Sequence, residues 1–142
     1  MILSEEQKMV LDMAIDFSAG RLAPGAVEWE KARAIPMEVL HEMGALGLMG
    51  MTVPEEYGGA GTDFVSYALA LMAIARGDGA VSTVMSVNNS PCCAALLKDG
   101  TEEQKQKYLV PLAKGEMIGA FCLTEPHAGS DASALKARLV RR

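Results

Sequence analysis

The sequence has few of the residues that several common functions require. Only 5% of its 142 residues are aromatic, and it contains three cysteines and two histidines. Cys92 and Cys93 are adjacent and Cys122 stands apart, so they form no disulfide framework and indicate buried, reduced thiols in an intracellular compartment. Neither His41 nor His127 has a local motif that would activate a cysteine nucleophile, and we expect no metal site.

Long apolar runs and a basic leader are also missing. The longest apolar stretch, around Phe64 to Ala75, is too short to cross a bilayer, so we expect no membrane span. Glu5, Glu6 and Asp12 appear at once, where a secretory or transit segment would be basic. The sequence therefore predicts an intracellular protein.

Basic residues are scarce over most of the chain. Four of the 13 Lys and Arg lie in the last seven residues, so residues 1–135 carry nine against 18 Asp and Glu, a net charge of −9. An acidic body excludes a nucleic-acid partner, because phosphate binding needs a basic face. We assign the basic end to the solvent side of a strand, with a contact to a ligand phosphate as the alternative.

By contrast, half of the residues are apolar, and they recur at helical spacing between capping residues, glycines and prolines. The pattern predicts an all-α fold, an orthogonal or up-down bundle of about six helices. Ser4, Asp63 and Thr101 precede three of them as capping residues. The expected helices are residues 5–20, 24–32, 36–47, 64–75, 80–97 and 102–112.

Methionine and asparagine mark two features of the expected interior. Helical cores use methionine to fill gaps, so we expect five of the ten methionines to pack inside, with a Met-lined binding cleft as the alternative. These are Met43, Met49, Met51, Met72 and Met85. Asn88, Asn89 and Ser90 interrupt an apolar helix, so these polar residues must be hydrogen-bonded or line a cavity.

A change of structure is expected after Gly115, which ends the last helix. The run from Met117 to Thr124 is β-like, and no partner strand is visible. We therefore divide the chain into a helical domain, residues 1–116, and the incomplete beginning of a β-domain, residues 117–142.

The most informative motif is Phe121-Cys-Leu-Thr-Glu-Pro-His-Ala-Gly-Ser-Asp131. Glu125-Pro126 forces a turn and residues 128–131 form another. Gly129 lets backbone N–H groups approach a ligand and Ser130 adds a hydroxyl, so the turn can cradle an anionic group such as a pyrophosphate. The alternative is a plain strand-to-turn connection in which Glu125 and Asp131 bond local backbone donors.

This motif, together with Val53-Pro-Glu-Glu-Tyr-Gly-Gly59, resembles the acyl-CoA dehydrogenase family of flavoproteins. The resemblance runs from the first helix to Arg142, whereas complete family members are several times longer. It implies an amino-terminal helical domain followed by the opening strand of the middle β-barrel domain. The upstream string then has a structural role, with Tyr57 packed beneath its loop.

The resemblance implies an FAD site formed by Phe121, Leu123, Thr124, Ala128, Gly129 and Ser130. Phe121 and Leu123 offer backbone contacts beneath the flavin ring, and the Thr124 hydroxyl bonds its pyrimidine edge. The turn at residues 128–130 holds the pyrophosphate, and Ser130 also faces the CoA of the substrate. Glu125 is expected to be a structural turn residue. Residues 87–91 lie where the second central helix of the family runs beside the acyl chain, and the alternative is a helix kink ahead of Pro91.

The family reaction is the α,β-dehydrogenation of an acyl-CoA to a trans-2-enoyl-CoA in fatty acid or amino acid catabolism. Electrons pass to electron-transferring flavoprotein, and the complete enzyme is a homotetramer in the bacterial cytoplasm or, as second choice, the mitochondrial matrix. The catalytic base is expected beyond Arg142, so this chain alone should be inactive. The alternatives are an acyl-CoA oxidase-like or nitroalkane-oxidising relative, and a non-catalytic helical binding or assembly module.

Overall fold

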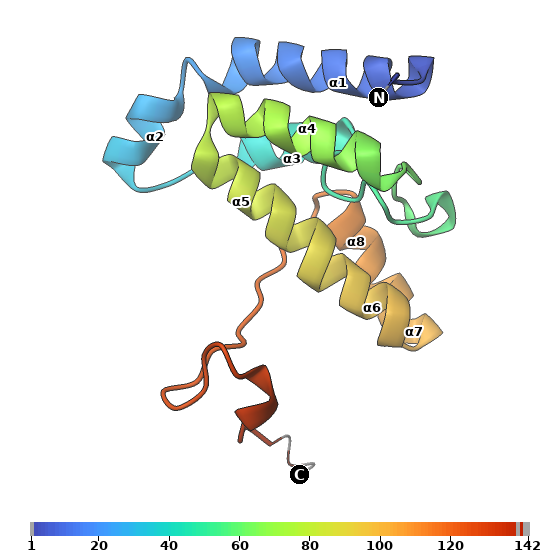
Figure 1. Cartoon of the computed structure of the whole chain (residues 1–142), viewed down its shortest axis with the longest axis vertical. Helices are drawn as coiled ribbons and strands as arrows, with labels where there is room; N and C mark the ends of the chain where they lie inside the picture. The colour runs from blue at the N-terminus through green and yellow to red at the C-terminus, as the bar shows by residue number, and fades with distance from the viewer. Residues whose placement is uncertain (1, 139, 141–142) are drawn as a thin grey trace.

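The computed structural model describes residues 2–138 and residue 140, and within them all the α-helices lie between Glu5 and Ala113 (Figure 1). Arg141 and Arg142 of the basic end lie outside the described residues. Three π-helical stretches, Ser18–Leu22, Asn88–Cys93 and Lys105–Leu109, continue or join neighbouring α-helices. The α-helices are α1 (Glu5–Phe17), α2 (Ala26–Ala32), α3 (Met37–Ala45), α4 (Phe64–Gly77), α5 (Gly79–Val87), α6 (Ala94–Asp99), α7 (Glu102–Gln104) and α8 (Val110–Ala113).

These pieces form six continuous helices among the described residues, which confirms the predicted all-α class and the number of helices. The stretch at Asn88–Cys93 joins α5 to α6, and the stretch at Lys105–Leu109 joins α7 to α8. Pro91 lies inside the first of these stretches, so the kink expected ahead of a proline is a π-helical segment. α2 begins after Gly25, so Pro24 lies in the preceding turn rather than in the first helical turn as predicted.

The predicted caps are present. Ser4 accepts a hydrogen bond from the Gln7 backbone N–H at 3.1 Å, and the Gln7 side chain accepts one from the Ser4 N–H, also at 3.1 Å. Thr101 and Gln104 repeat this reciprocal arrangement at α7. Asp63 caps α4 by accepting from two backbone N–H groups. Short polar motifs therefore fixed three helix starts locally.

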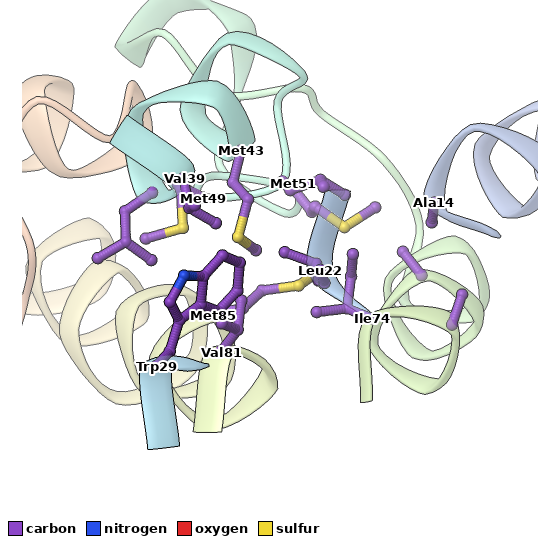
Figure 2. Packing of buried hydrophobic residues seen from close by; sticks show 14 residues of the cluster. Ala14, Leu22, Trp29, Val39, Met43, Met49, Met51, Ile74, Val81 and Met85 are labelled. Atoms are coloured by element: carbon purple, nitrogen blue, oxygen red, sulfur yellow. The ribbon is translucent and has the colours of Figure 1, made fainter. Parts of the chain in front are cut away.

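The helices pack around a methionine-rich core. α1 lies along α4, and α4 turns at Asp78 into α5 (Figure 1). Figure 2 shows side chains from α2, α3, α4, α5 and the loop after α3 converging on Trp29 and Met43. Four of the five selected methionines are buried, but Met72 is 67% exposed on α4, so its predicted burial is wrong. Met72 lines the open groove between α4 and α5, where no other described element covers it.

The loop after α3 is shaped by its glycines. Gly58 and Gly61 have φ angles of 78° and 62°, in the left-handed region that favours glycine. Gly59 does not, but a Cβ there would lie 2.1 Å from the Val53 carbonyl oxygen, so it is required for space. The Tyr57 hydroxyl donates to Glu102 at 2.9 Å, which ties this loop to α7.

The strand predicted from Met117 to Thr124 is wrong. No strand forms anywhere in residues 2–138, and the sole β-type pairing described there is the isolated bridge between Glu125 and Ala128. Figure 1 shows this part of the chain leaving the helices as an extended trace. An apolar, β-prone run becomes a strand only when a neighbour pairs with its N–H and C=O groups, and no described segment does so.

Candidate functional site

The motif of residues 121–131 is an extended segment followed by a tight turn. The Glu125 N–H donates to the Ala128 carbonyl at 2.9 Å, and the Ala128 N–H donates back to the Glu125 carbonyl at 3.1 Å. Ala128 is only 3% exposed. The exchange of two backbone hydrogen bonds across Pro126 and His127 defines the turn, because it fixes both of its ends.

The Glu125 carboxylate closes a larger loop around this turn. It accepts from the backbone N–H groups of Lys136 and Ala137 at 2.9 and 2.8 Å, and His127 Nε2 lies 3.2 Å from it. Both carboxylate oxygens are therefore occupied by neighbouring backbone. This arrangement suits the structural turn role expected of Glu125 and not that of a general base, which needs a free oxygen facing substrate.

Most of the predicted cofactor residues lie on the surface. Phe121 and Leu123 are 52% and 41% exposed, and Thr124, Gly129 and Ser130 are exposed as well. The structure brings the six predicted residues together in one short stretch, whose role in binding FAD stays a prediction.

The turn has the features that an anion such as the FAD pyrophosphate requires. A Cβ at Gly129 would meet no atom within 4 Å, so the backbone there is open to a ligand. Within residues 2–138, the N–H groups of Gly129 and Ser130 donate to no other group, and two such donors beside a hydroxyl can bind an anion. The Ala128 N–H is already bonded to the Glu125 carbonyl, and the predicted contact of Ala128 with the cofactor stays a prediction.

Asn88 and Asn89 form the most polar part of the interior, and both are hydrogen-bonded as predicted, whereas Ser90, the third residue of that prediction, is exposed. Asn89 accepts from the Met51 N–H at 2.7 Å and donates to the carbonyls of Leu48 and Met85. Asn88 is 0% exposed and bonds three separate segments. The sequence signalled their burial, since two amides stand in an apolar helix, but it gave no sign of their partners.

An open groove lies between α4 and α5. Leu71, Met72 and Ala75 line one side, and Ser82, Thr83, Ser86 and Val87 line the other. Its walls mix apolar and hydroxyl side chains. Val87 is the one residue of the expected acyl-chain segment that reaches it, and the passage of an acyl chain there stays a prediction.

The three cysteines differ in environment. Cys92 and Cys93 are buried, as expected, whereas Cys122 is exposed, so its predicted burial is wrong. Burial raises the pKa of Cys93 to about 12, with the neighbouring Cys92 adding to the shift. Cys93 is therefore protonated at neutral pH and chemically inert. Cys122 loses its cover because the run that carries it forms no strand.

In residues 2–138, no group of three His, Cys, Asp or Glu side chains is placed to hold a metal ion. Among the helices of the same range, none has the length and apolar character needed to cross a membrane.

Comparison with known proteins identifies the chain. The family described as "Acyl-CoA dehydrogenase, N-terminal domain" matches residues 4–116. The chain belongs to the acyl-CoA dehydrogenase family. An acyl-CoA dehydrogenase of Bacillus subtilis (strain 168) is 45% identical over 142 residues, which are 100% of this chain and 38% of that protein. The chain therefore spans little more than a third of this relative.

Solved structures agree with this membership. A chain in a structure described as the electron transferring flavoprotein of Acidaminococcus fermentans matches with a TM-score of 0.89 and 46% identity, over 94% of this chain and 35% of that one. A glutaryl-CoA dehydrogenase from Mycobacterium smegmatis, solved in complex with FADH2, matches with a TM-score of 0.89 and 36% sequence identity. The match covers 94% of this chain and 34% of that one. The fold of this chain is thus one shared by flavin-containing relatives.

Proposed function

We propose that this chain is the amino-terminal part of an FAD-dependent acyl-CoA dehydrogenase. The enzyme would convert an acyl-CoA to a trans-2-enoyl-CoA and pass the electrons to electron-transferring flavoprotein. The observation that carries the proposal is the open turn at Gly129 and Ser130, held by Glu125, in a chain of this family. The relative with bound FADH2 and the match in a structure of electron transferring flavoprotein support the cofactor and the partner.

Within this proposal, each residue of the motif has a task that its environment allows. The exposed Thr124 hydroxyl would hydrogen-bond the flavin pyrimidine edge, and the N–H groups of Gly129 and Ser130 would hold the pyrophosphate. Phe121 and Leu123 would lie beneath the ring, and Ser130 would also face CoA. FAD held by these residues would supply the two-electron acceptor that the dehydrogenation needs.

The rest of the enzyme belongs to the same proposal. The division at residue 116 would separate the helical domain from the start of the β-domain, and the catalytic base would lie beyond Arg142. The assembled enzyme would be a homotetramer. The proposed compartment is the bacterial cytoplasm, in keeping with the Bacillus subtilis relative.

A flavin titration tests the cofactor site. Quenching of FAD fluorescence by the 142-residue chain should saturate, and both Ser130→Ala and Gly129→Val should weaken the binding. Gly79→Val is the matched control, because a Cβ at Gly79 also meets no atom within 4 Å but lies far from the motif in the sequence. Equal binding by all four proteins would count against this site.

A chimera tests the reaction. This chain would replace the matching amino-terminal 38% of the Bacillus subtilis relative. The chimera should retain FAD and reduce a dye acceptor in the presence of acyl-CoA without oxygen, and Gly129→Val should lower its flavin content. A folded chimera that binds FAD but oxidises no acyl-CoA would contradict the proposed reaction.

A further inference from the structure

Asn88 connects the helical body to the segment that follows it. We use helical body for residues 2–116. The Asn88 Nδ2 donates to the carbonyl oxygens of Met49 at 2.8 Å and Leu112 at 3.0 Å, and its Oδ1 accepts from the Gly119 N–H at 2.8 Å. One buried amide thus joins the loop after α3, the last helix and the chain beyond residue 116. Asn88 is 0% exposed, so water does not compete for these bonds.

Gly119 is held by close contact as well as by this hydrogen bond. A Cβ at position 119 would lie 2.7 Å from both Cβ and Sγ of Cys92 and 3.3 Å from the Asn88 side-chain oxygen. No residue larger than glycine fits without moving the π-helical stretch Asn88–Cys93. Ile118, the preceding residue, packs against the core. Asn88, Cys92 and Gly119 therefore form a clamp with both polar and steric parts.

The clamp lies just before the predicted flavin-binding residues. Phe121 lies two residues after Gly119, and Thr124 lies five residues after it. A fully extended chain of five residues spans about 17 Å. Without an anchor at Gly119, small rotations of the backbone would sweep Thr124 and the turn through several ångströms. The segment between them has no other bond to the helical body among the described residues.

We propose that Asn88 is a positioning residue for the flavin site. Through Gly119 it sets the direction in which residues 121–130 leave the helical body, and so the place of Thr124 and the 128–130 turn relative to α5. The inference rests on the proposed function for the identity of the ligand. The clamp itself consists of the contacts of Asn88 and Cys92 with Gly119, so it can be tested without FAD.

Asn89 provides a matched control. It is the same residue type, is equally buried and makes three hydrogen bonds, but all of them stay within the helical body. Replacing either amide by alanine leaves buried backbone groups unpaired, so both variants lose stability. Only the Asn88 variant also frees Gly119.

A second pair of variants leaves both core amides in place. Gly119→Ala breaks the fit against Cys92 without removing any side-chain hydrogen bond of the core. Gly20→Ala is its control, because a Cβ at Gly20 meets no atom within 4 Å. The clamp can therefore be tested even if Asn88→Ala fails to fold.

The experiment compares the unchanged 142-residue chain with these four variants. Amide chemical shifts and hydrogen exchange of residues 119–130 report the position of the segment, urea unfolding reports stability, and fluorescence titration with FAD reports affinity. We expect Asn88→Ala and Gly119→Ala to shift the amide signals of residues 120–124, to speed exchange at residue 119 and to weaken FAD binding about tenfold. Asn89→Ala should lose stability yet keep these signals and the FAD affinity, and Gly20→Ala should change none of them.

The outcomes separate the clamp from the proposed function. If Asn89→Ala moves the signals of residues 120–124 as much as Asn88→Ala does, or if Gly119→Ala moves none, the positioning role is wrong. If the unchanged chain binds no FAD, the cofactor site of the isolated chain fails, and the amide signals alone then decide the clamp. Shifts confined to the Asn88 and Gly119 variants support it in that case too.

Discussion

The helical body and the segment after it treat their apolar side chains in opposite ways. Met43, Met49 and Met85 are fully buried in the helical body, whereas Phe121 and Leu123 in residues 117–138 are 52% and 41% exposed. The two parts also differ in how their backbone groups are hydrogen-bonded. The helices satisfy their own N–H and C=O groups, while the extended run at residues 120–124 bonds to no neighbour among the described residues.

The difference shows how much each kind of structure needs from elsewhere in the chain. A helix closes its backbone hydrogen bonds locally, so a helical pattern needs only a surface on which to pack. A strand has no backbone bonds of its own and requires a partner. The predictions below either sharpen or break this contrast, beginning with the largest expected effect.

Thiol reactivity should differ by orders of magnitude between the two parts. Cys122 is exposed, whereas Cys93 is buried with its pKa raised to about 12, and burial also raises the pKa of Cys92. At pH 8 the native chain should react with maleimide at Cys122 more than about 100-fold faster than at the other two, because the thiolate is the nucleophile. Mass spectrometry after timed labelling measures the rates, and comparable rates at all three would show that the core opens readily.

Truncating a core methionine should cost far more than truncating a residue of the segment. Met85 is 0% exposed, so Met85→Ala should lower the free energy of unfolding by about 3 kcal/mol. Leu123→Ala and the control Met72→Ala, at an exposed position, should each stay within about 0.5 kcal/mol. Urea unfolding provides the comparison. A loss at Leu123 near that of Met85 would mean that the segment is packed in solution.

Replacing a glycine by alanine should also destabilise the helical body more than the segment after it. A Cβ at Gly59 would lie 2.1 Å from the Val53 carbonyl oxygen, so Gly59→Ala should destabilise the fold by about 1–3 kcal/mol. Gly129→Ala meets no atom within 4 Å and should stay within about 0.5 kcal/mol. Thermal unfolding followed by circular dichroism measures both. Equal effects would remove the distinction in packing.

The smallest expected effect concerns the cap of α4. Hydrogen bonds from the Ser66 N–H, the Gln7 side chain and the Val65 N–H lower the pKa of Asp63. A lowered folded pKa means that the carboxylate stabilises the fold above its unfolded pKa of about 3.9, and that this stability is lost as the pH falls through the folded value. Asp63→Asn keeps an oxygen acceptor but cannot titrate.

Urea midpoints at a series of pH values test this expectation. The midpoint of the Asp63→Asn variant should fall less steeply than that of the unchanged chain below about pH 4. Leu123→Ala should leave the slope unchanged, because the cap lies in the helical body. Parallel curves for Asp63→Asn and the unchanged chain would show that this cap contributes no pH dependence.

The sequence predicted the features that depend on nearby residues. Ser4, Asp63 and Thr101 cap helices as expected, because a capping hydroxyl or carboxylate bonds N–H groups two or three residues away. The six helices and the closed turn at Glu125 follow from signals of the same short range.

The failures involve residues whose environment is set by distant parts of the chain. Helical spacing does not say which side of α4 will be covered, so the burial of Met72 could not be read from it. The run from Met117 to Thr124 has the composition of a strand, but composition does not supply a partner. For the same reason Cys122 is exposed although its neighbours are apolar.

The amino-acid sequence by itself determined the helix caps, the six-helix pattern and the turn that carries Gly129 and Ser130, because the interactions that form them act within a few residues. It also marked the family through the motif of residues 121–131. Only the tertiary structure decided that Asn88 bonds Gly119 across 31 residues and that Gly119 lies against Cys92. Such contacts depend on how helices and loops far apart in the chain are packed, and no local pattern specifies that arrangement.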